Sequence, residues 1–240
     1  MNIDEFSSKM SQKAKQMGIE IQPKKMQQFY EYMNLLLQWN EKINLTAIVE
    51  KEEIMTKHFM DSLTILRYVK PSEKVLDIGT GAGFPGIPLG IMKTETSITL
   101  LDSLQKRILF LQDVIQKIDL YNVIPIHARA EEMILHPNKR QAFDLVVSRA
   151  VASLPVLLEY MLPYVKINGC AICMKGPEIE KEMQEAQRAL KELGGKIEKV
   201  DNMMLPQTDI QRNLIIIRKE KETPIKYPRK AGIPTKKPIV

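Results

Sequence analysis

The pattern of apolar and polar residues predicts a helical first part of the chain, residues 1–70. After Pro23, a residue favoured in the first turn of a helix, Met26 and Phe29 begin an apolar stripe at helical spacing. A second amphipathic helix is expected over residues 51–68. This part is therefore expected to form an N-terminal helical extension.

From residue 71 onward, short apolar segments alternate with helical ones. Strands are expected at residues 75–78, 97–101, 123–127, 143–147, 170–174, 197–201 and 213–218. Helices are expected between them, at residues 85–92, 105–118, 153–164 and 178–193. Such alternation is typical of a doubly wound, mostly parallel sheet with helices on both faces. Residues 71–218 are therefore expected to form one α/β domain.

The net charge of +6 is concentrated in a third part, residues 219–240. This tail holds seven basic and two acidic side chains, whereas residues 1–70 carry a net charge of +1 and residues 71–218 carry none. Four prolines among the cations limit chain entropy, so the tail is expected to hold its charges in a semi-rigid extended array. RNA is the natural partner of such an array, and a solvated tail without a partner is the alternative.

Composition limits the classes of protein to consider. With 240 residues, of which 44% are hydrophobic, the chain can form a domain of ordinary size with an extension. No basic-then-apolar signal segment opens the sequence, and no apolar run approaches the ~20 residues that span a bilayer. A cytoplasmic protein without membrane partners is expected.

Cys170 and Cys173 have the C-x-x-C spacing of redox and zinc motifs. In a strand, however, an offset of three places the two side chains on opposite faces, and four zinc ligands are not found nearby. Two core thiols are the favoured interpretation. The three histidines are scattered along the chain, so no metal site is expected.

The first predicted strand of the α/β domain leads into a glycine-rich loop, VLDIGTGAGFPG, at residues 75–86. In a doubly wound sheet, ligands bind at the carboxyl ends of the strands. Gly79 and Gly81 allow the backbone to turn sharply and to approach a ligand closely. Asp102, at the end of the second strand, can accept hydrogen bonds from both hydroxyls of a ribose.

The loop admits two cofactors. Its last three glycines match the G-x-G-x-x-G pattern of dinucleotide-binding proteins, but that triplet begins three residues after the strand, and Pro85 removes an amide that would hold a pyrophosphate. Asp77 suits instead the positively charged methionine end of S-adenosylmethionine, directly or through a water. Asp102 fits either cofactor. The loop therefore favours S-adenosylmethionine.

Several further motifs accompany the loop. They are WNEKINLT (39–46), HFMDSL (58–63), HARAE (127–131), SRA (148–150), Lys175-Gly176 and PRKAGIPTKKP (228–238). With this set, the chain resembles the bacterial 16S rRNA guanine-N7 methyltransferase G family, also called glucose-inhibited division protein B, nearly from end to end. Asp102 stands where many members of that family have Glu.

The resemblance implies a class I S-adenosylmethionine-dependent methyltransferase fold with an N-terminal helical extension. It also implies methylation of N7 of a single guanine in a decoding-region loop of 16S rRNA, free or in the small ribosomal subunit. A monomer is expected. A non-catalytic RNA-binding ribosome assembly factor is the alternative. Together, the resemblance and the loop give these cofactor contacts: Gly79, Gly81, Phe84, Asp102, Ala130, Glu131 and Arg149.

Chemistry and charge suggest the remaining roles. Guanine N7 offers a lone pair and carries no hydrogen, so no catalytic base is assigned. Phosphate contacts are expected from Lys175, Lys226, Arg229, Lys230, Lys236 and Lys237. The candidates for stacking on a base are Trp39, Phe84 and Tyr164.

Two further pairs of residues keep two interpretations each. Asn40 and Asn44 either form turn hydrogen bonds or lie near the target base. His58 and Asp61 share a helix face, where they either bond each other or face the cleft.

Overall fold

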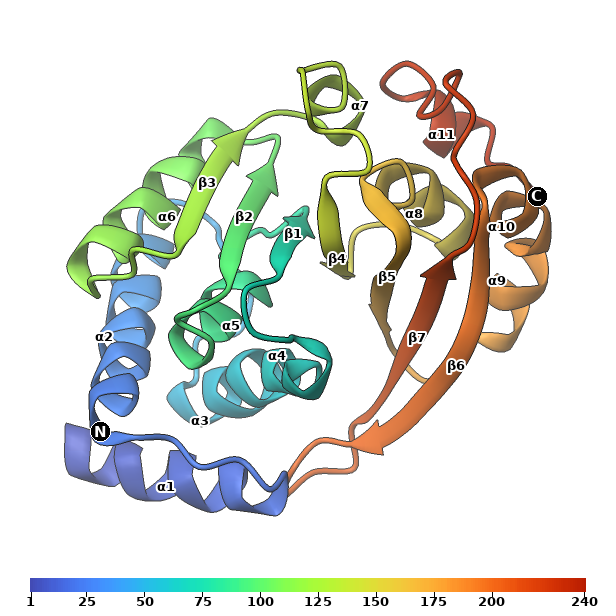
Figure 1. Ribbon diagram of the computed structural model, residues 1–240. Helices are drawn as coiled ribbons and strands as arrows, with labels where there is room; N and C mark the ends of the chain where they lie inside the picture. The colour runs from blue at the N-terminus through green and yellow to red at the C-terminus, as the bar shows by residue number, and fades with distance from the viewer.

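The sheet is built from short runs rich in Val, Ile and Leu, which are buried almost continuously because helices cover both faces. A computed structural model describes residues 1–240, with seven strands in the order β3-β2-β1-β4-β5-β7-β6 (Figure 1). The first five strands pair in parallel, and β7 runs antiparallel to both β5 and β6. The predicted doubly wound, mostly parallel sheet is confirmed. The strands are β1 (Lys74–Ile78), β2 (Ser97–Asp102), β3 (Val123–His127), β4 (Phe143–Arg149), β5 (Val165–Lys175), β6 (Gly195–Met204) and β7 (Gln211–Lys219).

Helices cover each face of the sheet over a separate apolar core. The first core contains the helical extension, and the second contains α8, α10 and part of the C-terminal tail. Elements that contribute to the first core are α1 (Ile3–Gln16), α2 (Pro23–Asn40), the π-helix η1 (Ile54–Met60), α4 (Asp61–Leu63), the 3₁₀ turn η2 (Leu66–Tyr68), α5 (Gly86–Met92) and α6 (Gln105–Lys117). The short helix α3 (Lys51–Glu53) leads into η1 and contributes no residue to this core. The other helices are α7 (Ala130–Met133), α8 (Leu154–Met161), α9 (Glu180–Glu185), α10 (Gln187–Leu193) and α11 (Ile233–Lys236). None of these helices is both long and apolar enough to cross a bilayer.

The helical extension is an integral part of the first core. Phe6, Phe29, Tyr32 and Phe59 are fully buried there, together with residues of α5 and α6. Tyr32 reaches the glycine-rich loop, where its hydroxyl donates to the carbonyl of Ala82. The extension therefore packs against the glycine-rich loop and helps to hold it in place.

The segment predicted as one helix over residues 51–68 differs from the expectation. It is continuous only from α3 to α4, its middle is π-helical, and it ends in a turn and the η2 segment. From Ile54 to Ile65, every residue except Lys57 is buried, so the segment is covered on all sides and not on one face alone. The predicted helix is confirmed over residues 51–63, and the prediction is wrong only at its end, where the chain leaves the helix for a turn and η2. Single π-helical turns within helices occur frequently at functional sites.

The two cysteines lie where the strand pattern predicts. Cys173 is fully buried in the second core, whereas Cys170 is half-buried against the first, so the side chains point to opposite faces of β5. Burial raises the pKa of the Cys170 thiol to about 11 and that of Cys173 to about 12. Neither thiol is poised to be a nucleophile at neutral pH.

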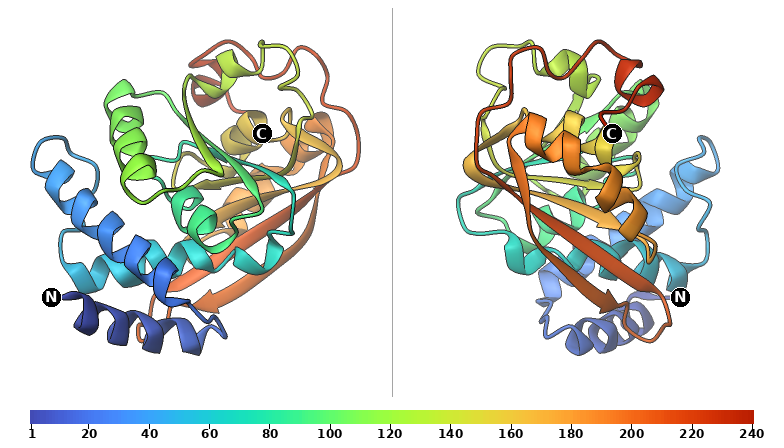
Figure 2. Two further views of the ribbon diagram at one scale, coloured as in Figure 1. Left: turned by 60° about the vertical axis from the view of Figure 1, so that its left-hand side comes forward. Right: turned by 90° about the vertical axis from the view of Figure 1, so that its right-hand side faces the viewer.

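The C-terminal tail, residues 219–240, is folded back on the domain. It passes beside α8 and α10 and forms α11 near α7 (Figures 1 and 2). Tyr227, Pro234 and Ile239 are buried. The tail is ordered, as expected for a semi-rigid array. Its contacts with the domain contribute to this order in addition to the stiffness of its prolines.

Candidate functional site

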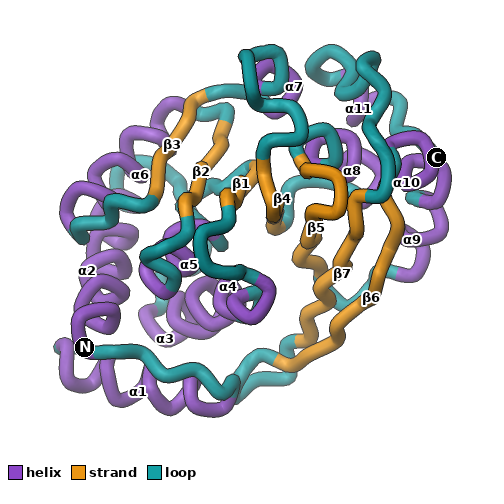
Figure 3. The backbone as a smooth tube through the Cα atoms, viewed as in Figure 1, coloured by secondary structure: helices purple, strands orange, loops and turns teal.

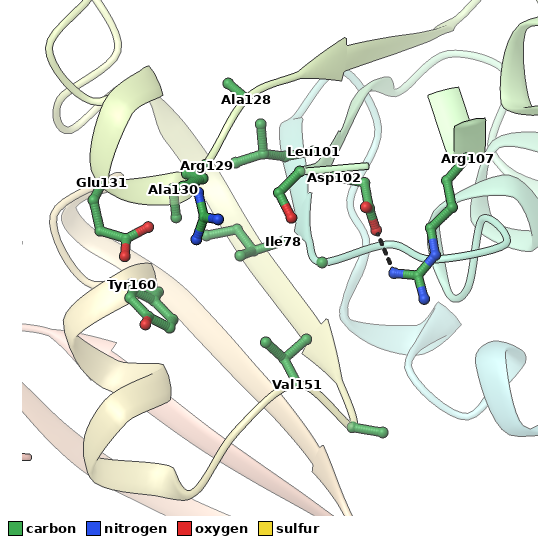
Figure 4. A pocket seen from close by; sticks show the side chains of 13 residues that line it. Ile78, Leu101, Asp102, Arg107, Ala128, Arg129, Ala130, Glu131, Val151 and Tyr160 are labelled. Atoms are coloured by element: carbon green, nitrogen blue, oxygen red, sulfur yellow. Dashed lines mark hydrogen bonds and ion pairs between the residues drawn. The ribbon is translucent and has the colours of Figure 1, made fainter. Parts of the chain in front are cut away.

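A cavity of about 310 Å³ opens at the carboxyl ends of the parallel strands. Its walls come from the loops that follow β1, β2, β3 and β4, and from Tyr160 of α8. In Figure 4, Asp102 and Arg107 lie on one side of the cavity, and Glu131 and Tyr160 on the other. The tube view shows the loop that leads from β3 to α7, whose first residues line the cavity (Figure 3). Of the predicted cofactor residues, Gly79, Asp102, Ala130 and Glu131 line this cavity.

The glycine-rich loop is fixed to the neighbouring strand. The amide of Gly79 donates to the carbonyl of Leu101 over 2.8 Å, and the amide of Gly81 donates to Asp102 Oδ2 over 2.9 Å. Gly79 has a φ of +68°, and a Cβ there would lie 2.5 Å from Val151 Cγ2. Only glycine allows this close approach between the first and fourth loops.

Asp102 connects several elements that surround the cavity through its hydrogen bonds. It is 2% exposed and accepts hydrogen bonds from the amides of Gly81 and Leu104 and from Arg107 Nη1, which lies 3.1 Å away. Its Oδ1 atom accepts only one of these hydrogen bonds, so it keeps a free lone pair. Arg107 was missed by sequence reasoning, although it lies five residues after Asp102 on the following helix. Its Nε is buried without a partner.

Asp77 lies behind the loop and does not line the cavity. Its Oδ2 accepts hydrogen bonds from Thr80 Oγ1 over 2.7 Å and from the amide of Gly86 over 2.8 Å. Its Oδ1 is buried without a hydrogen-bond partner, and burial raises the pKa of the carboxyl to about 6. A Cβ on Gly86 would approach Asp77 Oδ2 to 2.9 Å, so a glycine is required at the start of α5.

Arg149 and Phe84 do not line the cavity, and they meet the helical extension instead. Arg149 Nη1 donates to Asp61 Oδ2 over 2.9 Å, and its Nη2 lies 3.2 Å from His58 Nδ1. The Phe84 ring stacks on His58 at 4.4 Å and lies under the Arg149 guanidinium at 4.9 Å. Arg212 Nε donates to the other oxygen of Asp61 over 2.9 Å. We call these five residues the junction cluster.

The junction cluster has a surplus of positive charge. Burial, followed by the charge of Arg149, lowers the pKa of His58 to about 3, so this imidazole is neutral at pH 7. Two guanidiniums therefore share the single carboxylate of Asp61, which is 1% exposed. Neither expected alternative for His58 and Asp61 holds: the two side chains do not bond each other or line the cavity, and both contact Arg149 instead.

Two candidates for stacking on a base are internal. Phe84 is 4% exposed within the junction cluster, and Tyr164 is fully buried, with its hydroxyl donating to the carbonyl of Ala130. Trp39 is half-buried and donates from Nε1 to Asp113 Oδ2 over 2.7 Å. Asn40 forms turn hydrogen bonds with Thr46, as one of its two interpretations predicts.

Two of the predicted phosphate contacts require correction. Lys175 Nζ donates to the carbonyl of Ala152 over 2.6 Å and to Glu182 over 2.7 Å, and its side chain is 11% exposed. Arg229 is paired with a buried glutamate, Glu159. Both cations are already bound inside the protein. The other predicted cations are exposed: Lys226, Lys230, Lys236 and Lys237.

The polar groups of the site match S-adenosylmethionine. Asp102 offers an acceptor to a ribose, Ile78 and Leu101 provide apolar walls for an adenine, and the polar groups around Glu131 suit its edge. Asp77, which the sequence suggested for the methionine end of the cofactor, is fully buried and does not line the cavity, so the structure does not bring it to the site. The first loop needs no phosphate cradle for this cofactor.

Comparisons with known proteins give the family of this chain. The family described as rRNA small subunit methyltransferase G matches residues 25–215. Ribosomal RNA small subunit methyltransferase G of Acetivibrio thermocellus is 50% identical over 223 residues, 92% of this chain and 92% of the relative. The protein of that name from Desulforamulus reducens is 47% identical over 239 residues, 99% of this chain and 100% of the relative.

Solved structures share the fold at low identity. The crystal structure of M. jannaschii TYW2 in complex with AdoMet matches with a TM-score of 0.53 and 15% identity, over 66% of this chain and 74% of that chain. The precorrin-6y C5,15-methyltransferase of Geobacter metallireducens matches with a TM-score of 0.51 and 16% identity, over 74% and 92%. The expected class I methyltransferase fold is confirmed.

The similarity to the curated relatives extends over nearly the whole chain, including the helical extension. The profile match likewise covers most of the extension and the α/β domain. Both agree with the family expected from the sequence motifs. The chain belongs to the rRNA small subunit methyltransferase G family.

Proposed function

We propose that this protein transfers a methyl group from S-adenosylmethionine to N7 of a single guanine in a decoding-region loop of 16S rRNA. It acts as a monomer in the cytoplasm. The observation that carries the proposal is the near full-length similarity to small subunit rRNA methyltransferases. The cavity at the strand ends, with Asp102 as its acidic hub, supports it.

The reaction requires no proton transfer by the protein. Bound S-adenosylmethionine supplies a methyl group already activated by a sulfonium. Guanine N7 attacks with a lone pair in the plane of the ring and loses no proton, so the chain needs no general base. Its residues act by aligning the two reactants and by excluding water.

The residues of the cavity divide this work. Asp102 binds the ribose of the cofactor, and Glu131 with the backbone near Ala130 binds the adenine edge. Gly79 keeps the first loop close enough for backbone contact. Arg149 and Phe84 act from the junction cluster, where the helical extension fixes the guanidinium beside the loop. Asp102 therefore determines cofactor affinity more directly than Arg149 does.

The test is nucleoside mass spectrometry on 16S rRNA that lacks the native modification. This RNA is incubated, free and within small subunits, with the protein and S-adenosylmethionine, and the site is then mapped. We expect one new 7-methylguanosine in a decoding-region loop. A methyl group at another base or atom would contradict the assignment.

The same experiment separates an enzyme from an assembly factor. The protein should bind adenosylhomocysteine in calorimetry and should not bind NAD. Binding of adenosylhomocysteine without methylation in either RNA context would favour the non-catalytic alternative. Comparing free RNA with subunits also identifies the substrate.

A further inference from the structure

A buried carboxylate anchors the C-terminal tail to the domain. Glu159 of α8 is 0% exposed, and Arg229 contacts both of its oxygens: the Arg229 amide and Nε reach Oε1 over 2.7 and 2.9 Å, and Nη2 reaches Oε2 over 2.6 Å. A buried carboxylate requires a charged partner, and a guanidinium provides one bidentately. We call this pair the latch. The tail is therefore seated by a specific contact.

The latch lies next to the cofactor cavity. Tyr160, the residue after Glu159, lines the cavity, and its hydroxyl forms a 3.2 Å hydrogen bond with Thr235 of α11. On the other side, α7 begins with Ala130 and Glu131, which also line the cavity. Figures 1 and 2 show α7 and α11 side by side from different directions. The seated tail thus contacts a residue of the cavity wall, Tyr160, although none of its own residues lines the cavity.

The tail carries only positive charge at this place. Residues 223–240 contain five basic and no acidic side chains. Among the cations of the tail, only Arg229 forms a salt bridge, whereas Lys230, Lys236 and Lys237 are exposed. The exposed Arg129 lines the cavity on the α7 side. We call these three lysines and Arg129 the basic rim.

We propose that the tail is a latched RNA-binding strap, in which the Arg229–Glu159 pair holds the basic rim lysines beside the cavity to bind phosphates flanking the target guanine. This rests on the proposed methylation of rRNA. A strand that delivers a base to the cavity brings its backbone past this rim, because Arg129 of the rim also lines the cavity and Thr235 of the tail is bonded to Tyr160 in the cavity wall. Arg229 is then a positioning residue, and the lysines are the phosphate contacts.

The first test removes the rim charges. The variant Lys230→Gln/Lys236→Gln/Lys237→Gln is compared with Lys15→Gln/Lys24→Gln/Lys70→Gln, which removes three exposed lysines away from the cavity. Binding of a 16S rRNA fragment is measured from 50 to 300 mM salt. The rim variant should bind roughly tenfold more weakly at low salt, with a salt slope smaller by about 2, as expected for three lost contacts. The control variant should match the wild type, and both should bind adenosylhomocysteine normally.

The second test separates the latch from a simple charge contact. Arg229→Lys preserves the charge and loses the bidentate geometry, and Lys230→Arg is its matched control. If Arg229 only contacts phosphate, Arg229→Lys should bind RNA as the wild type does. A latch predicts instead faster tryptic cleavage within the tail and RNA affinity lowered about fivefold. The control should change neither.

Further outcomes decide the remaining cases. If Arg229→Lys stays protease-resistant, the double variant Glu159→Gln/Arg229→Gln removes the latch altogether, and a tail that remains seated overturns the latch. Equal RNA binding by the rim variant and its control overturns the strap, even when the wild type methylates 16S rRNA. Conversely, weakened RNA binding by the rim variant, in a wild type that methylates nothing, retains the strap and removes the proposed function.

Discussion

The two ends of the chain attach to the sheet domain in opposite ways. The helical extension buries aromatic residues in the first core and joins the site through the junction cluster, where Asp61 is 1% exposed. The tail buries few side chains, closes with the latch and leaves most of its cations in water. Both attachments contain a buried carboxylate paired with arginine. Asp61 of the junction cluster lies within the first core, whereas Glu159 of the latch is covered by the tail. We infer that substitutions in the junction cluster lower the stability of the whole fold, whereas substitutions in the latch change only how the tail is seated on the surface.

The largest expected effect comes from the centre of the junction cluster. Asp61→Ala leaves the guanidiniums of Arg149 and Arg212 without their counterion in a buried place, and breaking a buried pair in this way costs about 3–5 kcal/mol of folding stability. Urea unfolding monitored by circular dichroism measures this loss. A cost below about 1 kcal/mol would mean that the junction cluster is solvated and resembles the tail.

Acid should weaken the extension through His58. Because its pKa in the folded protein is about 3, below the ordinary value of 6.5, the unfolded chain binds more protons between these pH values. The folding stability that neutral His58 contributes is therefore fully present above pH 6.5 and is lost as the pH falls toward 3. The loss of stability reaches about 3 kcal/mol by pH 4. The stability difference between the wild type and His58→Gln, followed from pH 7 to pH 4, should shrink accordingly. A pH-independent difference would contradict this.

Substitutions in the cavity, between the extension and the tail, should lower the affinity for the cofactor more than the stability of the fold. Gly79→Ala places a Cβ against Val151 at a φ of +68°. Such strain costs about 1–3 kcal/mol, which corresponds to a loss of roughly 10- to 100-fold in adenosylhomocysteine affinity. Calorimetry on Gly79→Ala and on Gly79→Ala/Val151→Ala separates the two causes, because the second variant removes the clash and keeps the backbone strain. Full recovery in the double variant would show that φ is unimportant.

The smallest effect on overall stability is expected in the tail. Ile239→Ala removes a buried side chain that packs with the second core. Because the tail can detach without unfolding the sheet, we expect a global loss below about 1 kcal/mol, less than the 2–5 kcal/mol of a similar change in a core. Leu36→Ala, in the first core, is the matched control and should show the full cost. Equal losses in both variants would place the tail in the same cooperative unit as the extension.

The sequence predicts the parts of this site that depend on local motifs. Gly79 follows β1, Asp102 ends β2, and Glu131 lies shortly after β3. Parallel strands bring their carboxyl ends to one edge, so the meeting of these residues follows from the fold class. Arg107 and Tyr160 were missed because each lies on a helix whose rotation about its axis is set by packing.

Charge alone misled the assignment of Lys175 and Arg229. The partner of Arg229 is Glu159 of α8, 70 residues earlier in the chain, and that of Lys175 is Glu182 of α9, seven residues later across a loop. A basic residue in a basic tail is read most simply as a surface cation. The sequence could not reveal that a carboxylate is buried under it.

The latch also has a consequence for the order in which the protein matures. Glu159 precedes Arg229 by 70 residues, so during synthesis helix α8 emerges from the ribosome well before the guanidinium that neutralises it. Until then its carboxylate remains hydrated, and Tyr160 has no Thr235 to bond. The hydrogen bond that Tyr160, in the cavity wall, makes to the tail therefore forms only when the tail closes over α8.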